Sequence, residues 1–340
     1  MTIKKSKKRL FKKKINKPTV EKKKITKYPP KDTFFRKNEK TIFLILFPII
    51  LGIVFLIIYI FNSKLLKLNH AIQTVNVIKY KVADYPVIDS SVVPALFAKA
   101  AIVIDQDSKK VIFAKNPDIR FSMASTAKIM TALVAMDYYH ANSVLTVRSG
   151  GIEGSGLGLL VGEQYLFDDL LYAMMLHSAN DAAVAIVDNF PGGRTAFVTE
   201  MNRKARDLYL ENTSFSDPAG LDDDGNFTTV IDLARLGAFA KKNVKLAEVV
   251  NTREKFISDL GKTREFDLEN LNRFLGYKGV NGIKTGTTEG AGEVLVTSVR
   301  INDHDFIIVI MNSTDRFADT DRLLYLISEN VRFEKPGNRN

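Results

Sequence analysis

The sequence contains no cysteine, which excludes disulfide bonds and metal sites with thiolate ligands. Histidine is also scarce, with four residues in 340, and no two of them have the His-x-x-x-His spacing of a metal-binding helix. We therefore expect neither a metal ion nor another cofactor. The four residues are His70, His140, His177 and His304.

Negative charge is nearly absent from residues 1–40, which hold 17 Lys and Arg against 3 Asp and Glu. The rest of the chain has 32 basic and 35 acidic residues, so the net charge of +11 belongs to this segment. Partitioned in this way, the charge no longer supports nucleic-acid binding, and no nucleic acid is expected as a partner. Residues 1–40 are predicted to be a basic, disordered tail that attracts anionic lipid head groups.

Charge of either sign is absent from residues 41–61, a run of 21 largely apolar residues. As a helix this run spans about 31 Å, which matches a hydrocarbon core of about 30 Å. It is longer than the roughly 7–15 apolar residues of a signal peptide, and residues 62–65 make a poor cleavage site. We expect one uncleaved transmembrane helix. Because Lys and Arg stay on the non-translocated side, the tail is predicted to be cytoplasmic and the remainder extracytoplasmic, at the cell membrane.

Beyond the apolar run, residues 62–95 are predicted to be a stalk, residues 96–335 a globular domain and residues 336–340 a tail. Strands are expected early and late in the domain, with helices between them. This order predicts an α+β fold, in which one antiparallel sheet unites the first and last strands and a helical region adjoins it. The strands are predicted at 98–105, 110–115, 293–299 and 305–311, and the helices at 125–139, 167–176, 181–189 and about 319–332. The glycine-rich residues 150–158 are expected to form a lid or a connector.

A serine and a lysine stand three residues apart in Ser125-x-x-Lys128, at the start of an apolar helical run. On a helix, the two side chains would lie on one face, one turn apart. A serine hydroxyl needs a nearby base to become a nucleophile, and a lysine is such a base only if burial or a cationic neighbour lowers its pKa. A helix that begins at Ser125 would also direct free backbone N–H groups toward an oxyanion. Taken alone, such a tetrad is more often a capped helix start with a solvated lysine.

Two further motifs follow in the chain: Ser178-x-Asn180, where a predicted helix breaks, and Lys284-Thr285-Gly286, before the late strands. Taken singly, the first could cap the following helix and the second is a common strand end. Together with Ser125-x-x-Lys128 they form the set described for β-lactamases and penicillin-binding proteins. With their flanking residues they resemble the low-molecular-mass D-alanyl-D-alanine carboxypeptidases, over roughly residues 95–335. The matching stretches are 123–131, 178–182, Asp217-Pro218-x-Gly220-Leu221 and 282–286.

The resemblance implies a β-lactamase-like fold and a set of catalytic residues. Ser125 would attack the carbonyl between the last two D-alanines of a peptidoglycan stem peptide and become acylated, while Lys128 takes its proton. Ser178 and Lys284 would pass a proton to the leaving D-alanine, and Asn180 would bind the substrate backbone. Water would then release the shortened peptide. β-Lactams are the inhibitors that this resemblance implies.

The resemblance also implies a substrate-binding strand. Lys284 and Thr285 would bind the terminal carboxylate, and the absence of a Cβ at Gly286 would let the substrate lie against the strand edge. The backbone N–H groups of Ser125 and Thr287 would form the oxyanion hole. In addition, an ammonium at Lys284 would lower the pKa of Lys128 by like-charge repulsion.

The chain departs from many of these relatives in two ways, which leave other functions open. It ends about 50 residues after Lys284, so no second all-β domain is expected, and its anchor is N-terminal rather than C-terminal. The alternatives are a serine β-lactamase, a D,D-endopeptidase and a catalytically silent binder of cell-wall peptide. Against a class A β-lactamase, the loop at Asp217–Leu221 has no glutamate to activate the deacylating water. Against a silent binder, Ser125, Lys128 and Lys284 are all present.

Overall fold

This computed structural model describes residues 39–73, 84–88, 91–221 and 224–334. They belong to two separate units, Met1–Tyr80 and Lys81–Asn340. The predicted tail at 1–40 lies outside the described residues except for its last two, which begin a helix, and the predicted tail at 336–340 lies wholly outside them.

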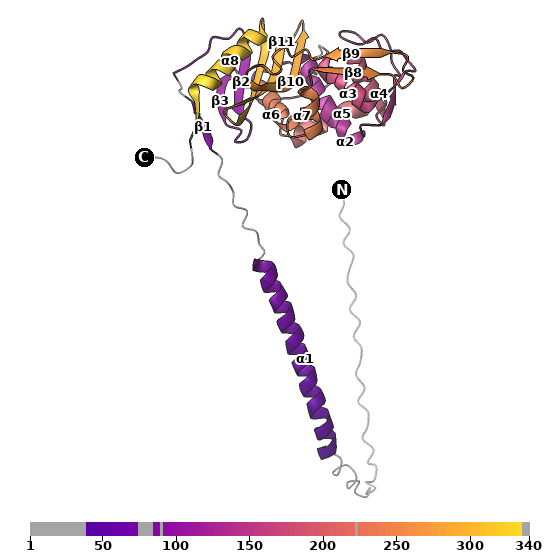
Figure 1. Cartoon of the computed structure of the whole chain (residues 1–340), viewed down its shortest axis with the longest axis vertical. Helices are drawn as coiled ribbons and strands as arrows, with labels where there is room; N and C mark the ends of the chain where they lie inside the picture. The colour runs from indigo at the N-terminus through magenta and orange to yellow at the C-terminus, as the bar shows by residue number, and fades with distance from the viewer. Residues whose placement is uncertain (1–38, 74–83, 89–90, 222–223, 335–340) are drawn as a thin grey trace, which may run out of the picture. The chain divides into compact units, whose positions relative to one another are not determined.

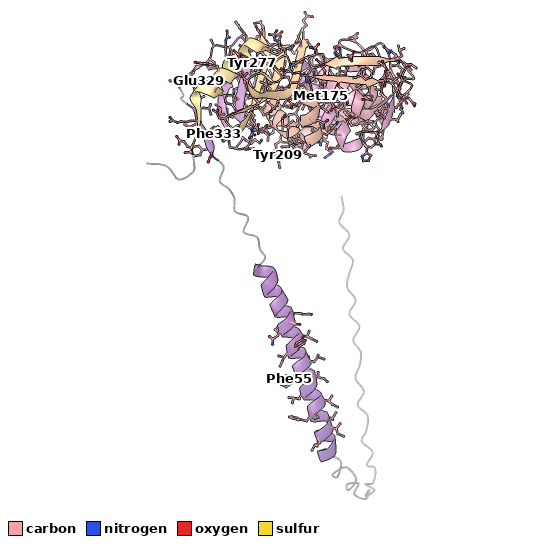
Figure 2. The ribbon with its side chains drawn as sticks, in the orientation of Figure 1. Phe55, Met175, Tyr209, Tyr277, Glu329 and Phe333 are labelled. Atoms are coloured by element: carbon pink, nitrogen blue, oxygen red, sulfur yellow. The ribbon has the colours of Figure 1, made fainter. Side chains whose placement is uncertain are left out.

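The first unit contains the helix α1 (Glu39–Gln73), which includes Pro48. Its segment Leu44–Lys64 has a mean hydropathy of 3.1, and none of it is buried in the protein. Figure 2 shows Phe55 projecting from this helix, as do its apolar neighbours. By length and composition α1 can cross a membrane. The predicted span at 41–61 lies within α1, which continues into the predicted stalk.

The second unit is built around a five-stranded antiparallel sheet in the order β10-β11-β12-β2-β3. The early strand β2 pairs with the late strand β12, with Val103 opposite Ile308, so the predicted α+β class and the meeting of first and last strands are confirmed. Hairpins join β10 to β11 and β11 to β12. The strands are β2 (Ala100–Asp105), β3 (Val111–Lys115), β10 (Val280–Thr288), β11 (Gly292–Ile301) and β12 (His304–Ser313).

Helices cover both faces of this sheet (Figure 1). The central strands are buried on both sides, which explains why they are continuous apolar runs rather than alternating ones. On one face Val103 and Ile308 pack with α8 (Arg316–Asn330), and on the other Ile102 and Val309 belong to the larger core of the helical region. The helices of that region are α2 (Lys128–Tyr138), α3 (Phe167–Leu176), α4 (Asn180–Asp188), α5 (Gly193–Asp207), α6 (Val230–Ala240) and α7 (Val244–Val250).

Four two-stranded sheets complete the described part of this unit, and one of them lies partly in the predicted stalk. β1 pairs with the last strand, β13, so that Tyr85 lies opposite Glu334. The domain therefore includes residues that the sequence assigned to 62–95. The four pairs are β1 (Tyr85–Ile88) with β13 (Val331–Glu334), β4 (Phe121–Ser122) with β7 (Phe227–Thr228), β5 (Val144–Thr146) with β6 (Gln164–Leu166), and β8 (Glu254–Ser258) with β9 (Glu265–Glu269).

Candidate active site

Ser125 lies in a short 3-10 helix, η1 (Ala124–Ala127), which leads directly into α2. The sequence predicted a single helix from Ser125, but the first turn is tighter. Two glycines explain how this turn is held. A Cβ on Gly220 would lie 1.8 Å from the Ala124 carbonyl oxygen, and one on Gly286 would lie 3.0 Å from the Ser125 nitrogen. The backbone of η1 is therefore packed between two backbone segments that approach it only where no side chain intervenes.

Lys128 is completely buried and its amine contacts three oxygen atoms. Its Nζ lies 2.8 Å from Ser125 Oγ, 2.7 Å from Asn180 Oδ1 and 2.7 Å from the Ala219 carbonyl oxygen. A neutral amine has two N–H groups and one lone pair. It can therefore donate to Asn180 and Ala219 while it accepts the proton of Ser125. The predicted proximity of the serine and the lysine is thus present.

Burial lowers the pKa of Lys128 to about 7, although the negative charges of Asp217 and Asp181 act in the opposite direction. The sequence offered burial and repulsion by Lys284 as causes of such a shift. In the structure burial is the main cause, and repulsion by Lys128 instead contributes, after burial, to lowering the pKa of Lys284 well below its usual value. The amine beside Ser125 is therefore neutral in a large fraction of molecules at neutral pH.

The strand β10 forms one wall of a cavity in front of Ser125, with a volume of about 230 Å³. Thr285, Gly286 and Thr287 line it, but Lys284 is only 1 % exposed, and its Nζ donates to the Thr285 carbonyl oxygen at 3.1 Å. The predicted carboxylate-binding lysine thus lies behind the wall of the cavity. Among the described residues, no group of acidic or histidine side chains is arranged to hold a metal ion.

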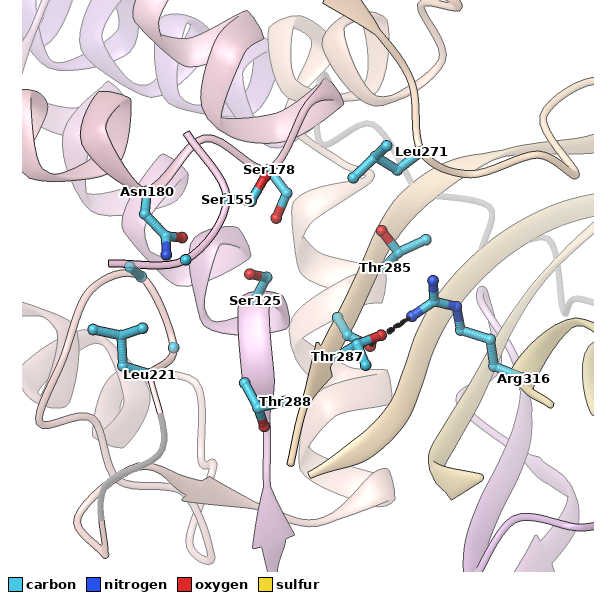
Figure 3. A pocket seen from close by; sticks show the side chains of 14 residues that line it. Ser125, Ser155, Ser178, Asn180, Leu221, Leu271, Thr285, Thr287, Thr288 and Arg316 are labelled. Carbon is cyan, nitrogen blue, oxygen red and sulfur yellow. Dashed lines mark hydrogen bonds between the residues drawn. The ribbon is translucent and has the colours of Figure 1, made fainter. Parts of the chain in front are cut away.

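Arg316, at the start of α8, supplies a second cation that the sequence did not point to. Its guanidinium donates to the Gly286 carbonyl oxygen at 2.7 Å and to Thr287 Oγ1 at 2.5 Å, as Figure 3 shows for Thr287. It lines the cavity directly. Nothing in its local sequence signals this, because its place depends on α8 packing beside the sheet.

Asn180 begins α4, and Ser178 and Ser155 lie beside it in the cavity wall (Figure 3). The side chain of Asn180 is already engaged: its Oδ1 accepts from Lys128, and its Nδ2 donates to the Glu153 carbonyl oxygen at 2.7 Å. Its backbone N–H donates to the Ser155 carbonyl oxygen. The predicted lid or connector at 150–158 is therefore tied to the second motif, and Asn180 holds Lys128 rather than presenting a free amide to the cavity.

The loop that begins at Asp217 supplies the remaining oxygen around Lys128. Asp217 Oδ1 accepts from the backbone N–H groups of Ala219 and Gly220, both at 2.8 Å. Gly220 has φ of +83°, which a residue with a side chain rarely adopts. This turn directs the Ala219 carbonyl oxygen at Lys128. The Asp217 loop, which has no glutamate to activate a deacylating water, therefore helps to position the base, Lys128.

Comparison with known proteins identifies relatives of this arrangement. Residues 88–315, more than half of the chain, match the peptidase S11 family, described as D-alanyl-D-alanine carboxypeptidase. The carboxypeptidase DacF of Bacillus subtilis is 31 % identical over 67 % of this chain and 61 % of its own length. The D-alanyl-D-alanine endopeptidase of Escherichia coli is 30 % identical over 68 % of this chain and 77 % of its own length.

Solved structures agree with this match. The DD-transpeptidase of Streptomyces K15 has a TM-score of 0.66 and 28 % identity, over 69 % of this chain and 98 % of that one. A D-alanyl-D-alanine carboxypeptidase from Mycobacterium tuberculosis has a TM-score of 0.65 and 26 % identity, over 71 % of this chain and 95 % of that one. The chain therefore belongs to the D-alanyl-D-alanine carboxypeptidase family of serine peptidases, the low-molecular-mass penicillin-binding proteins.

Proposed function

We propose that this protein is a membrane-anchored serine D-alanyl-D-alanine carboxypeptidase, which removes the terminal D-alanine from peptidoglycan stem pentapeptides. The observation that carries the proposal is the contact of 2.8 Å between Lys128 Nζ and Ser125 Oγ, made by a buried amine whose pKa is about 7. A lysine in this state can accept the hydroxyl proton at neutral pH, which an ordinary surface lysine cannot do.

Acylation begins when Ser125 Oγ attacks the carbonyl carbon of the penultimate D-alanine and its proton passes to Lys128. The negative charge on the substrate oxygen is stabilised by the backbone N–H groups of Ser125 and Thr287. Loss of one such donor costs roughly 3–4 kcal/mol in comparable acyl-transfer sites. Collapse of the intermediate breaks the peptide bond, and Ser178, with Lys284 behind it, relays a proton to the departing amine. Water then hydrolyses the ester on Ser125.

The terminal carboxylate is bound at the strand β10. Thr285 lines the cavity there, Arg316 lies at its rim and Lys284 lies behind it. Burial, and after it repulsion by Lys128 and Arg316, lowers the pKa of Lys284, so an arriving carboxylate offsets this repulsion and favours the protonated form of Lys284. The absence of a Cβ at Gly286 makes room for η1 rather than for the substrate, as the sequence had suggested, since a Cβ there would lie 2.9 Å from Ala124 Cβ. Asn180 acts by holding Lys128.

Residues 1–40 are proposed as the cytoplasmic tail, 41–61 as the span and 336–340 as a tail. The catalytic domain outside the membrane comprises the predicted 96–335 together with β1, which shortens the predicted stalk at 62–95. The 17 basic residues before the apolar run support this orientation, and they also favour anionic lipid at the inner face.

β-Lactams acylate Ser125 in place of the substrate. Because the Asp217 loop offers no glutamate, the resulting ester hydrolyses slowly, so that β-lactams inhibit the enzyme.

The test uses the full chain in detergent with a peptide that ends in D-Ala-D-Ala. We expect stoichiometric release of D-alanine, its loss in Ser125→Ala, and a penicilloyl adduct on Ser125 by mass spectrometry. If no adduct formed, the chain would be a silent binder. Rapid turnover of penicillin would instead indicate a β-lactamase.

A second candidate is D,D-endopeptidase action on cross-linked stem peptides. It is favoured by two relatives named D-alanyl-D-alanine endopeptidase, of which the chain covers 76 % and 77 %, against 61 % of the Bacillus carboxypeptidase. Product analysis on a pentapeptide and on a cross-linked dimer separates the two activities.

A further inference from the structure

A second hollow, of about 350 Å³, lies away from the active site between the β2–β3 hairpin and α6. We call it the basic groove. Its floor is apolar, with Ile104, Leu208 and Ile231 at the bottom, and two exposed apolar side chains, Val111 and Phe239, stand at its edge. This volume falls within the range of small-molecule and head-group sites, about 300–1,000 Å³.

Three cations surround the basic groove: Lys109 from the hairpin, and Arg235 and Lys242 from α6 and the residues after it. Burial, and after it repulsion by the like charge of Lys242, lowers the pKa of Lys109. Within the described chain, neither lysine is within salt-bridge distance of a carboxylate, and Arg235 is paired with Asp232 at 3.3 Å.

Acidic side chains near the basic groove do not neutralise it. Asp105 and Asp107 are the carboxylates that act on Lys109. Asp105 is buried and accepts from the Ser108 backbone N–H at 2.7 Å, which leaves Asp107 as the exposed negative charge on this hairpin. Positive charge therefore predominates around an apolar hollow, a combination that fits a ligand with an anionic head and an apolar body.

The position of the basic groove in the fold indicates which ligand with an anionic head and an apolar body binds there. Lys110, next to Lys109, donates to the Pro86 carbonyl oxygen at 2.6 Å, so the hairpin lies against β1, where the chain arrives from α1. Residues 74–83 separate α1 from this unit and can reach at most about 35 Å. In the sheet, β3 is the edge strand opposite β10, so the groove and the active site lie at opposite edges.

We infer that the basic groove docks the domain onto a bilayer that contains anionic lipid, with a lipid phosphate between Lys109, Arg235 and Lys242 and the acyl region against Val111 and Phe239. This inference rests on the membrane anchorage proposed above. Charge complementarity and the short connection to α1 favour a lipid over a soluble polyanion. Docking at the β3 edge leaves the cavity at β10 open to peptide.

Because the chain has no cysteine, one introduced cysteine gives a single site for a fluorescent label. The position at the groove is Tyr209, which follows Leu208 and is 75 % exposed (Figure 2). The comparison position is Tyr325 on α8, which is 61 % exposed and lies on the other side of the sheet. Full-length Tyr209→Cys and Tyr325→Cys proteins, each with one fluorophore, are reconstituted in phosphatidylcholine vesicles with or without phosphatidylglycerol. Quenching by nitroxide on the lipid acyl chains is measured, and flotation with the vesicles reports anchorage separately.

We expect phosphatidylglycerol to increase quenching at position 209 several-fold and to leave position 325 unchanged. Lys109→Glu with Lys242→Glu should abolish the increase. The matched control is Lys262→Glu, which like Lys109 sits at positive φ in a hairpin turn, and it should have no effect. Penicillin labelling of Ser125 checks that each variant is folded, and none of these lysines belongs to the active site.

Equal quenching in both kinds of vesicle, or an increase that survives the double charge reversal, would overturn the inference. The inference would also be overturned if inorganic polyphosphate reduced quenching of the fluorophore at position 209 in phosphatidylcholine vesicles while phosphatidylglycerol had no effect. The groove would then bind soluble polyanions. Loss of flotation would instead refute the proposed anchor, which distinguishes the two failures.

Discussion

The pH dependence of acylation tests the assignment of Lys128 as the base. Burial lowers the pKa of this lysine to about 7, and only the neutral amine can accept the proton of Ser125. The rate of acylation by a penicillin should therefore fall as the pH falls through 7 and level off above about pH 8. The rate falls toward low pH because protonation of Lys128 removes the base.

The expected size follows from the titration of a single group. With a pKa of about 7, roughly one tenth of the molecules carry neutral Lys128 at pH 6 and roughly nine tenths at pH 8, so the second-order rate constant should rise about tenfold across this interval. An ordinary lysine pKa, 10.5, would instead give a rise of about tenfold for every unit up to pH 10. The assay is the time course of fluorescent penicillin incorporation at limiting concentration, in buffers of constant ionic strength.

Asp217→Asn provides the control, because the Asp217 carboxylate raises the pKa of Lys128 while an asparagine oxygen can still accept the backbone N–H groups of the turn. The midpoint should move to lower pH. Lys284 also has a lowered pKa, and two interacting groups titrate as a pair. The charge of Asp217 affects the pKa of Lys128 but is not among the causes of the lowered pKa of Lys284. A shift of the midpoint in Asp217→Asn therefore identifies Lys128 as the titrating group. A rate that is independent of pH from 5 to 9, or that rises steadily to pH 10, would refute Lys128 as the base.

Three further outcomes are expected. Gly220→Ala should cost about 2–4 kcal/mol of folding free energy in chemical denaturation, since its methyl group would meet the Ala124 carbonyl oxygen at a positive φ; an unchanged midpoint would contradict this. Asn180→Ala should slow penicillin acylation by about 10–100-fold, because a hydrogen bond to a charged or reacting group is worth about 1.5–3 kcal/mol. Arg316→Met should raise KM about tenfold for a peptide acid but leave the peptide amide unchanged, whereas equal effects would exclude a carboxylate contact.

The elements that the sequence predicted well are those whose pattern is local. The helix predicted at 167–176 has these bounds in the structure, because an apolar periodic run is bounded there by a break at His177. Three strands of the central sheet, β2, β11 and β12, were predicted from apolar segments, which are continuous because both faces of these strands are buried. The short strands β1 and β13 were missed, because neither has a pattern of its own and each exists through pairing with the other.

The three motifs located the candidate site but not the arrangement of its polar groups. The sequence brought Ser125 and Lys128 together, since a single turn joins them. It did not predict that Lys284 lies behind the cavity wall, that Asn180 is engaged by Glu153, or that Arg316 reaches the strand. Each of these depends on how distant segments pack. The roles of the site residues, Ser178 and Thr287 included, therefore stay predictions until the variants are measured.

The pairing of β1 with β13 brings the first and the last described strands of the second unit together, with Tyr85 opposite Glu334. Domains whose ends lie together tolerate relocation of their termini. A short peptide joining residue 334 to residue 84, with the chain reopened at the exposed turn around Lys262, would give a circular permutant detached from α1. Such a permutant offers a route to crystals and titrations without detergent.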